Sequence, residues 1–198
     1  MIDEMVEIPS IEPSASAGGC PQDVSISDSR WYVMRVTYSR ELKAMQLLQK
    51  ANVECYVPML YVRDEFGKHT VPAVHNLIFV HTTRDVLDTC KRRMEAVCPL
   101  RYMMDKSTKL PMVVRNKEME DFMWVTEHHD ADIFYLDNPS VVCVKGTPIE
   151  VIGGPFKGLH GRLLRIRRNR KVVLQLVGLV AVAIDGIPIE CCKISTKV

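Results

Sequence analysis

The last third of the sequence consists of short β-branched apolar runs that are separated by glycine, asparagine and proline. Such short runs, bounded by turn residues, are typical of strands and leave little room for helices. Five of them predict a small all-β, five-stranded barrel in residues 145–198, because closure into a barrel removes exposed sheet edges. The predicted strands cover residues 148–152, 161–166, 172–177, 180–187 and 192–194.

Upstream, strand-like runs alternate with amphipathic helical segments. An aromatic and β-branched strand begins at Trp31, Ser39 and Thr83 are predicted helix N-caps, and the polar residues 63–68 read as a hairpin tip between two strand segments, 53–62 and 69–82. This interleaving predicts an α+β domain with an antiparallel sheet flanked by helices. The predicted apolar helix faces are Ala44, Leu47, Leu48 and Ala51; Val86, Cys90 and Met94; and Met119, Phe122 and Met123.

Two further segments interrupt these patterns. Residues 1–29 are rich in Ser, Pro, Gly and acids, which predicts a disordered acidic tail. Residues 128–144 mix acids, histidines and an Asn-Pro pair, which predicts a linker. The predicted order is therefore tail, α+β domain over 30–127, linker over 128–144, and barrel over 145–198.

The net charge of +2 is unevenly spread, at −5 over residues 1–30 and +7 over residues 145–198. The basic excess favours an anionic or nucleic-acid partner for the last segment, although a solvated basic face explains it equally well. The sequence has neither a long apolar stretch nor a basic start followed by an apolar run. We therefore expect no membrane span and no signal peptide, and a cytoplasmic protein.

The polar residues suggest no catalytic site. The seven cysteines lack paired metal-ligand spacing and read as reduced core residues. His128-His129 could suggest a metal and Cys191-Cys192 a thiol site, but no second pair completes a coordination set and neighbours on a strand point oppositely. No nucleophile, base and orienting residue recur in a recognisable arrangement. We expect no enzyme activity, no metal and no cofactor.

The run KGTPIEVIGGPFKGLHGRLLRI at residues 145–166 resembles a KOW motif, through Gly154, Pro155, Phe156, Gly158 and Gly161. Together with WYVMRV from Trp31 and VHNLIFV at 74–80, it resembles the NusG family of transcription elongation factors. The acidic extension and the run Val74-His75-Asn76-Leu77, where relatives often carry aromatic-Pro-Gly-Tyr, resemble the specialised RfaH-like and UpxY-like paralogues. The resemblance implies an NGN domain followed by an SH3-like KOW barrel.

The same resemblance implies an operon-specific antitermination factor. Its N-terminal domain would sit on the clamp helices of RNA polymerase and disfavour pausing and termination. Three of the matching positions, Trp31, Tyr32 and Phe79, lie on predicted strands and could equally be sheet core. The residues that match the polymerase-facing patch are Trp31, Tyr32, Val74, Asn76, Leu77 and Phe79.

Other positions match nucleic-acid and partner contacts of relatives. Basic residues near the first two helices could touch the non-template DNA strand, and leader RNA is a further possible partner. The barrel of a monomer could bind a ribosomal protein, the termination factor Rho or RNA. The alternative is a KOW-bearing ribosome- or RNA-binding protein. The residues are Arg40, Lys43, Lys91, Arg92 and Arg93 for DNA, and Arg165, Arg167, Arg168 and Arg170 on the barrel.

Overall fold

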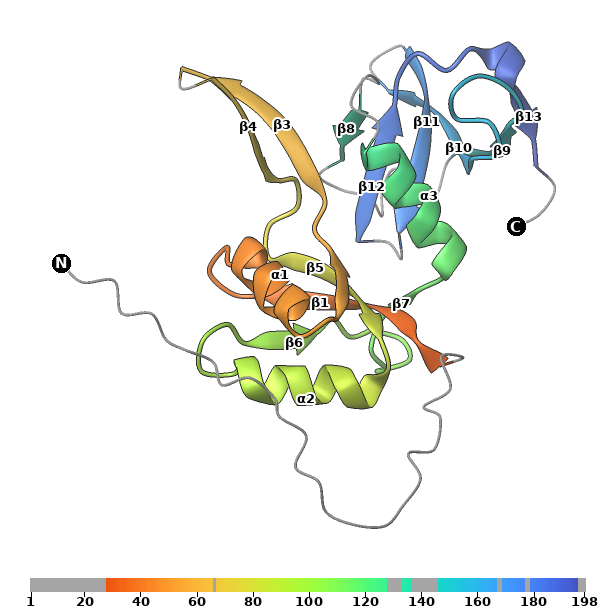
Figure 1. Ribbon diagram of the computed structural model, residues 1–198. Coiled ribbons are helices and arrows are strands. Elements are labelled where there is room, and N and C mark those ends of the chain that lie inside the picture. Colours follow the sequence, from red (N-terminus) through yellow and green to blue (C-terminus); the bar gives the residue numbers. More distant parts are fainter. Residues whose placement is uncertain are drawn as a thin grey trace.

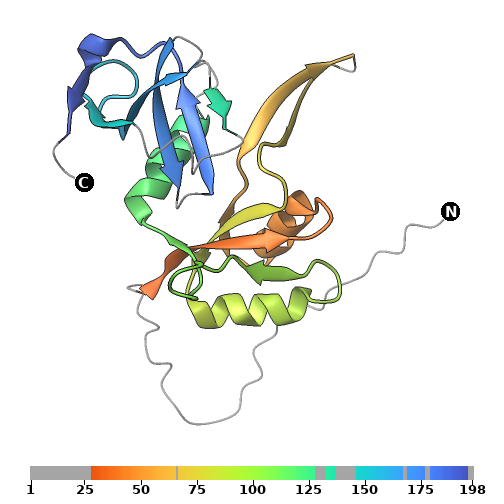
Figure 2. The ribbon, with the colours of Figure 1, turned by 180° about the vertical axis from the view of Figure 1, so that it is seen from behind.

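The computed structural model describes residues 28–65, 67–127, 133–136, 146–166, 169–176 and 179–195. Within these ranges, two antiparallel sheets and a separate hairpin are joined to three α-helices. Helix α3 (Asn116–Glu127) lies between the two sheets, as Figures 1 and 2 show from opposite sides. The predicted α+β unit and the all-β unit are thus both present, in the predicted order.

The first sheet is centred on β1 (Arg30–Val36) and has the order β2-β5-β1-β6, with β7 also pairing β1. Side chains alternate along β1, so Tyr32 and Met34 face one side while Trp31 and Val33 face the other. Every one of these side chains is buried, because both faces of the sheet are covered. The other strands are β2 (Glu54–Tyr56), β5 (Leu77–Thr82), β6 (Leu100–Tyr102) and β7 (Val113–Val114).

Helices α1 (Glu41–Lys50) and α2 (Arg84–Met94) cover the face that carries Tyr32 and Met34. Three predictions about them need correction. Ala51, predicted on the apolar face of α1, is the exposed C-cap residue after the helix ends at Lys50. Arg40, not Ser39, is the N-cap residue of α1. On α2 it is Leu87, not Val86, that is buried with Cys90 and Met94, because a helix starting at Arg84 turns Leu87 toward the sheet and leaves Val86 41% exposed.

Helix α3 covers the opposite face and joins the two sheets. Phe122 is fully buried, with its ring 6.0 Å from Phe79 and 6.3 Å from Tyr56. On its other side, Trp124 packs edge-to-face on Phe156 of the second sheet's loop, with ring centroids 5.5 Å apart. A single apolar cluster therefore runs from the first sheet through α3 into the second sheet.

The second sheet has six strands in the order β13-β9-β10-β11-β12-β8, which corrects the predicted closed barrel of five. The added strand β8 (Ile133–Tyr135) comes from the predicted linker, because Ile133 and Tyr135 pack on the shared cluster. Among the described strands, β13 and β8 do not pair, so the ladder stays open. The others are β9 (Thr147–Val151), β10 (His160–Ile166), β11 (Asn169–Leu176), β12 (Val180–Ile184) and β13 (Cys192–Ile194), after a 3-10 turn (Ile189–Cys191).

A long hairpin of β3 (Met59–Asp64) and β4 (Gly67–Pro72) projects from the first sheet (Figure 1). The single strand predicted over 53–62 is broken at Val57-Pro58, since β2 pairs with β5 whereas β3 pairs only with β4. At the base of the hairpin, the Tyr135 hydroxyl lies 3.5 Å from the Met59 carbonyl oxygen. The hairpin thus also touches β8, an edge strand of the second sheet.

Candidate functional site

The apolar residues predicted to face a partner are mostly buried. Trp31, Leu77 and Phe79 lie under α3 and the second sheet, whereas Tyr32 lies under α1 and α2. They are sheet core in this structure, the alternative that strand alternation left open. Only Val74 and Asn76 of the predicted patch, on the turn between β4 and β5, retain intermediate exposure.

Asn76 holds this turn to the start of α1. Its backbone is left-handed, with φ 60°, and its carbonyl oxygen accepts from the Val36 amide at 3.0 Å. The Asn76 side-chain oxygen accepts from the Ser39 backbone amide at 3.1 Å. The Asn76 backbone amide donates to the carboxylate of Glu41. Glu41 is only 1% exposed, so this bond satisfies a buried acceptor. Asn76 is therefore a structural residue of the turn.

The segment tied down by Asn76 carries an unusual backbone. Tyr38 and Ser39 are consecutive left-handed residues, with φ 59° and 51°. Each such non-glycine residue costs roughly 1–2 kcal/mol, and strain of this kind clusters at functional sites. The Tyr38 side chain is nonetheless 82% exposed, and the Arg40 guanidinium lies 5.4 Å from its ring centroid. Sequence reasoning missed Tyr38, because no residue type here signals a left-handed turn.

Of the two predicted basic residues at the start of α1, Arg40 lies beside Tyr38. The Arg40 guanidinium donates to the Val97 carbonyl oxygen at 3.0 Å, and Lys43 lies on the exposed side of α1. Burial raises the pKa of the Cys98 thiol, while Arg40 and Lys43 act in the opposite direction, as two cations near that sulfur do. Tyr38 and Arg40 thus form an exposed pair of an aromatic ring and a cation.

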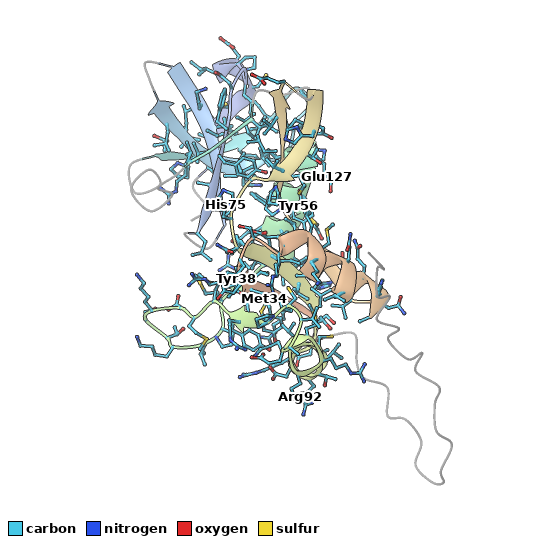
Figure 3. The ribbon with its side chains drawn as sticks, turned by 90° about the vertical axis from the view of Figure 1, so that its left-hand side faces the viewer. Met34, Tyr38, Tyr56, His75, Arg92 and Glu127 are labelled. Carbon is cyan, nitrogen blue, oxygen red and sulfur yellow. The ribbon has the colours of Figure 1, made fainter. Side chains whose placement is uncertain are left out.

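The three basic residues of α2 behave differently. The Lys91 ammonium lies 3.5 Å from Asp88 and 4.1 Å from the Tyr102 ring centroid, so it is engaged within the fold. Arg92 and Arg93 are exposed, and Figure 3 shows Arg92 pointing away from the sheets. The neighbouring groove is lined by carboxylates as well as by cations. Because carboxylates lie beside these cations, this groove attracts phosphates only weakly.

The loop between β9 and β10 is shaped by its glycines. Gly154 and Gly158 have φ 79° and 91°, and the Gly158 amide donates to Val151 at 2.7 Å. Phe156 is 5% exposed against α3, while Pro155 is exposed. A side chain at Gly161 would come within 3.0 Å of the Val173 carbonyl oxygen, so glycine permits close strand packing there.

The predicted arginine cluster of the second unit is only partly described. In the backbone register of the sheet, Arg165 on β10 lies opposite Arg170 on β11. Arg167 and Arg168, like His128 and His129, lie outside the described residues.

The described part of the chain offers no metal-binding group of three or more ligands and no disulfide. Its five cysteines are free thiols. Desolvation, followed by the charge of Glu54, raises the pKa of the Cys55 thiol to about 11, so that thiol is a poor nucleophile near neutral pH. No helix in the described ranges is long and apolar enough to cross a membrane.

Comparison with known families gives a match to the model described as transcription termination factor nusG, over residues 29–123. Residues 29–123 form a NusG domain. The matched region contains the first sheet, the hairpin, α1, α2 and most of α3, whereas the second sheet lies outside it. Comparison with curated proteins gave no match. The NusG domain supports a place for the chain among transcription elongation and termination factors.

Proposed function

We propose that this NusG-like chain is an operon-specific elongation and antitermination factor of the RfaH-like and UpxY-like type. It binds the clamp helices of RNA polymerase through residues 30–127 and suppresses pausing or termination, while the second sheet recruits another factor. The NusG match over 29–123 is the observation that carries this proposal. The protein acts in the cytoplasm as a monomer, without enzyme activity or a cofactor.

The partly exposed turn between β4 and β5 is the best-supported starting point for polymerase contact. Most of the predicted apolar patch is buried, but Val74 and exposed His75 lie at the rim of the same cluster. Figure 3 labels both His75 and Tyr38 toward the left-hand end of the first sheet. A factor that binds the closed polymerase more tightly than the open one shifts the polymerase toward the closed state by that difference in affinity. Suppression of pausing follows from such a shift.

Retention of core RNA polymerase by the immobilised full chain tests this proposal. Val74→Asp places a charge at the proposed contact and is expected to abolish most retention. Val86→Asp makes the same change on α2, where the side chain is 41% exposed on the other side of the sheet, and is expected to retain polymerase. Circular dichroism establishes that both variants are folded. If both variants retained polymerase equally, the turn between β4 and β5 would not be part of the interface.

A second candidate, a ribosome- or RNA-binding protein, is favoured by the KOW-like run and by the +7 charge of residues 145–198. The same immobilised chain separates the two functions. If the wild-type chain fails to retain polymerase but retains ribosomes or RNA, the antitermination proposal is rejected in favour of this one. Retention of polymerase with loss of paused transcripts in a run-off assay supports the first.

A further inference from the structure

We propose that Cys191 and Cys192 form a dithiol site that chelates trivalent arsenic, supplied as arsenous acid or as an organic arsenous acid. The site lies at the end of the second sheet, outside the residues of the family match, and it does not depend on the proposed function. Three observations carry it: two consecutive free thiols, a backbone turn that holds both of them, and the number of ligands that they offer.

The backbone at the two cysteines does not follow strand alternation. Cys191 ends the 3-10 turn and Cys192 begins β13, so the expectation that neighbours on a strand point oppositely does not apply to this pair. The Cys192 thiol donates back to the Pro188 carbonyl oxygen at 3.6 Å. The same oxygen accepts from the Cys191 backbone amide at 3.0 Å. A shared acceptor in one turn therefore holds both residues.

The pair is packed against the sheet without being sealed from solvent. Both cysteines are half-buried at the border of the shared apolar cluster. A Cβ atom at Gly153 would lie 3.2 Å from the Cys191 sulfur, so this thiol lies against the start of the loop between β9 and β10. The Cys191 carbonyl oxygen accepts from the Ile152 amide at 2.7 Å. The thiols are thus held at a fixed place that a small ligand can reach.

The surroundings of the pair favour a neutral reagent. Burial, followed by the negative charges of Cys191 and Glu190, raises the pKa of the Cys192 thiol. The two thiols are therefore close enough to influence each other, and Cys192 stays protonated near neutral pH. Reagents that need a thiolate react slowly with such a thiol. Arsenous acid is uncharged at this pH, and each sulfur–arsenic bond replaces one arsenic–hydroxyl bond while the thiol proton leaves with that hydroxyl as water. Two waters are released and arsenic stays trivalent, so no oxidant is required.

The number of ligands selects the class of ligand. Cys191 and Cys192 are the only consecutive cysteines in the sequence. Among the residues that the structure describes, no third His, Cys, Asp or Glu completes a metal-binding group. Structural zinc takes four ligands, whereas an organic arsenous acid has two hydroxyls to exchange and is satisfied by two thiols. The second bond forms within one molecule, so the chelate outlasts a bond to a single thiol.

Intact-mass spectrometry of the folded full chain after addition of equimolar phenylarsine oxide tests the site. The wild type is expected to form a single adduct that resists excess mercaptoethanol, a monothiol, and is removed by ethanedithiol, a competing chelator. Cys191→Ser and Cys192→Ser are each expected to lower the resistance of the adduct to mercaptoethanol on the order of 100-fold. Cys55→Ser is the matched control, because Cys55 is also a half-buried free thiol, and it is expected to behave as the wild type does.

Thermal melts establish which variants are folded. Loss of the resistant adduct in both single variants of the pair, with its persistence in Cys55→Ser, supports the site. A wild type that forms no adduct, or an adduct equally resistant in Cys191→Ser or Cys192→Ser, would overturn it. If a serine variant does not fold, fragmentation of the wild-type adduct locates the arsenic instead. Arsenic on residues 188–194 supports the site, whereas arsenic on any other part of the chain rejects it.

Discussion

At the scale of single residues, the left-handed pair Tyr38 and Ser39 stores strain that a glycine would relieve. Ser39→Gly is expected to raise the free energy of unfolding by about 0.5–1 kcal/mol, because glycine adopts φ 51° without steric cost, although its unfolded chain is more flexible. Ser39→Ala keeps the Cβ atom and is expected to give no gain. Urea unfolding of both variants measures the difference. A stability for Ser39→Gly equal to that of Ser39→Ala would show that the turn is unstrained.

A second residue-scale prediction concerns Asp105, in the turn after β6. Its carboxylate accepts from the Ser107 hydroxyl and from the amides of Thr108 and Ser107, and these bonds lower the Asp105 pKa to about 2. Because the folded pKa lies below the ordinary value of about 4, this carboxylate stabilises the turn above that pH. The stabilisation is lost as the pH falls toward 2.

Carbon NMR titration of the Asp105 carboxyl group measures this pKa directly. Ser107→Ala removes the hydroxyl that contributes most, so the midpoint is expected to rise toward the ordinary value. Thr108→Ala serves as the control, since the Thr108 side chain is the smallest contributor and its amide bond is kept. A midpoint that stays at about 2 in Ser107→Ala would assign the shift to the backbone amides instead.

Contacts between single polar side chains were the feature that the sequence patterns predicted least. Asn76 and Glu41 are 35 positions apart, and their bond arises only because β5 and α1 meet at the same end of the sheet. Strand and helix periodicity predicts which elements form, but not which polar side chains meet at their ends. The structural role of Asn76, and with it the position of Tyr38, therefore could not be predicted from the pattern.

At the scale of elements, helix α3 packs on both of its neighbours. Periodicity placed the helix correctly, and Met119 and Phe122 are buried as predicted. Met123, predicted to complete the apolar stripe, is only half-buried, while Val125 is fully buried. A helix between two sheets buries a wider arc than a stripe facing one sheet, so the single-face pattern understated the contact. The strand β8 was missed because three residues are too few for a periodic signal.

Truncation of Phe122 tests how much α3 contributes. The ring is fully buried against Phe79 and Tyr56, so Phe122→Ala is expected to lower the free energy of unfolding by about 3–5 kcal/mol. Met123→Ala, one position along the same helix and half-buried, is expected to cost clearly less. Urea unfolding followed by circular dichroism gives both values. Similar costs for the two variants would contradict the assignment of Phe122 as the central contact.

At the scale of the whole molecule, the sequence predicted two separate units where the structure has one shared apolar cluster. The patterns in 30–127 and 145–198 each showed an apolar face but could not show what covers it. Phe156 of the KOW-like loop packs on Trp124 of α3, which belongs to the other predicted unit. The residues of the family match and the sheet outside it are therefore coupled through α3.

This coupling predicts that the chain unfolds in one transition. Fluorescence of the two tryptophans, Trp31 in β1 and Trp124 in α3, should change together with the far-ultraviolet ellipticity that reports α1 and α2.

Phe156→Ala removes a side chain that is 5% exposed. The expected loss in the free energy of unfolding is about 3–5 kcal/mol, which corresponds to a fall of roughly 6–20 °C in Tm for a chain of this size. Ile194→Ala, at 69% exposure in β13, is expected to change Tm little. Because the cluster is shared, Phe156→Ala should lower the Tm seen by fluorescence and the Tm seen by ellipticity equally. If the transition of the first sheet did not move, the two sheets would unfold independently.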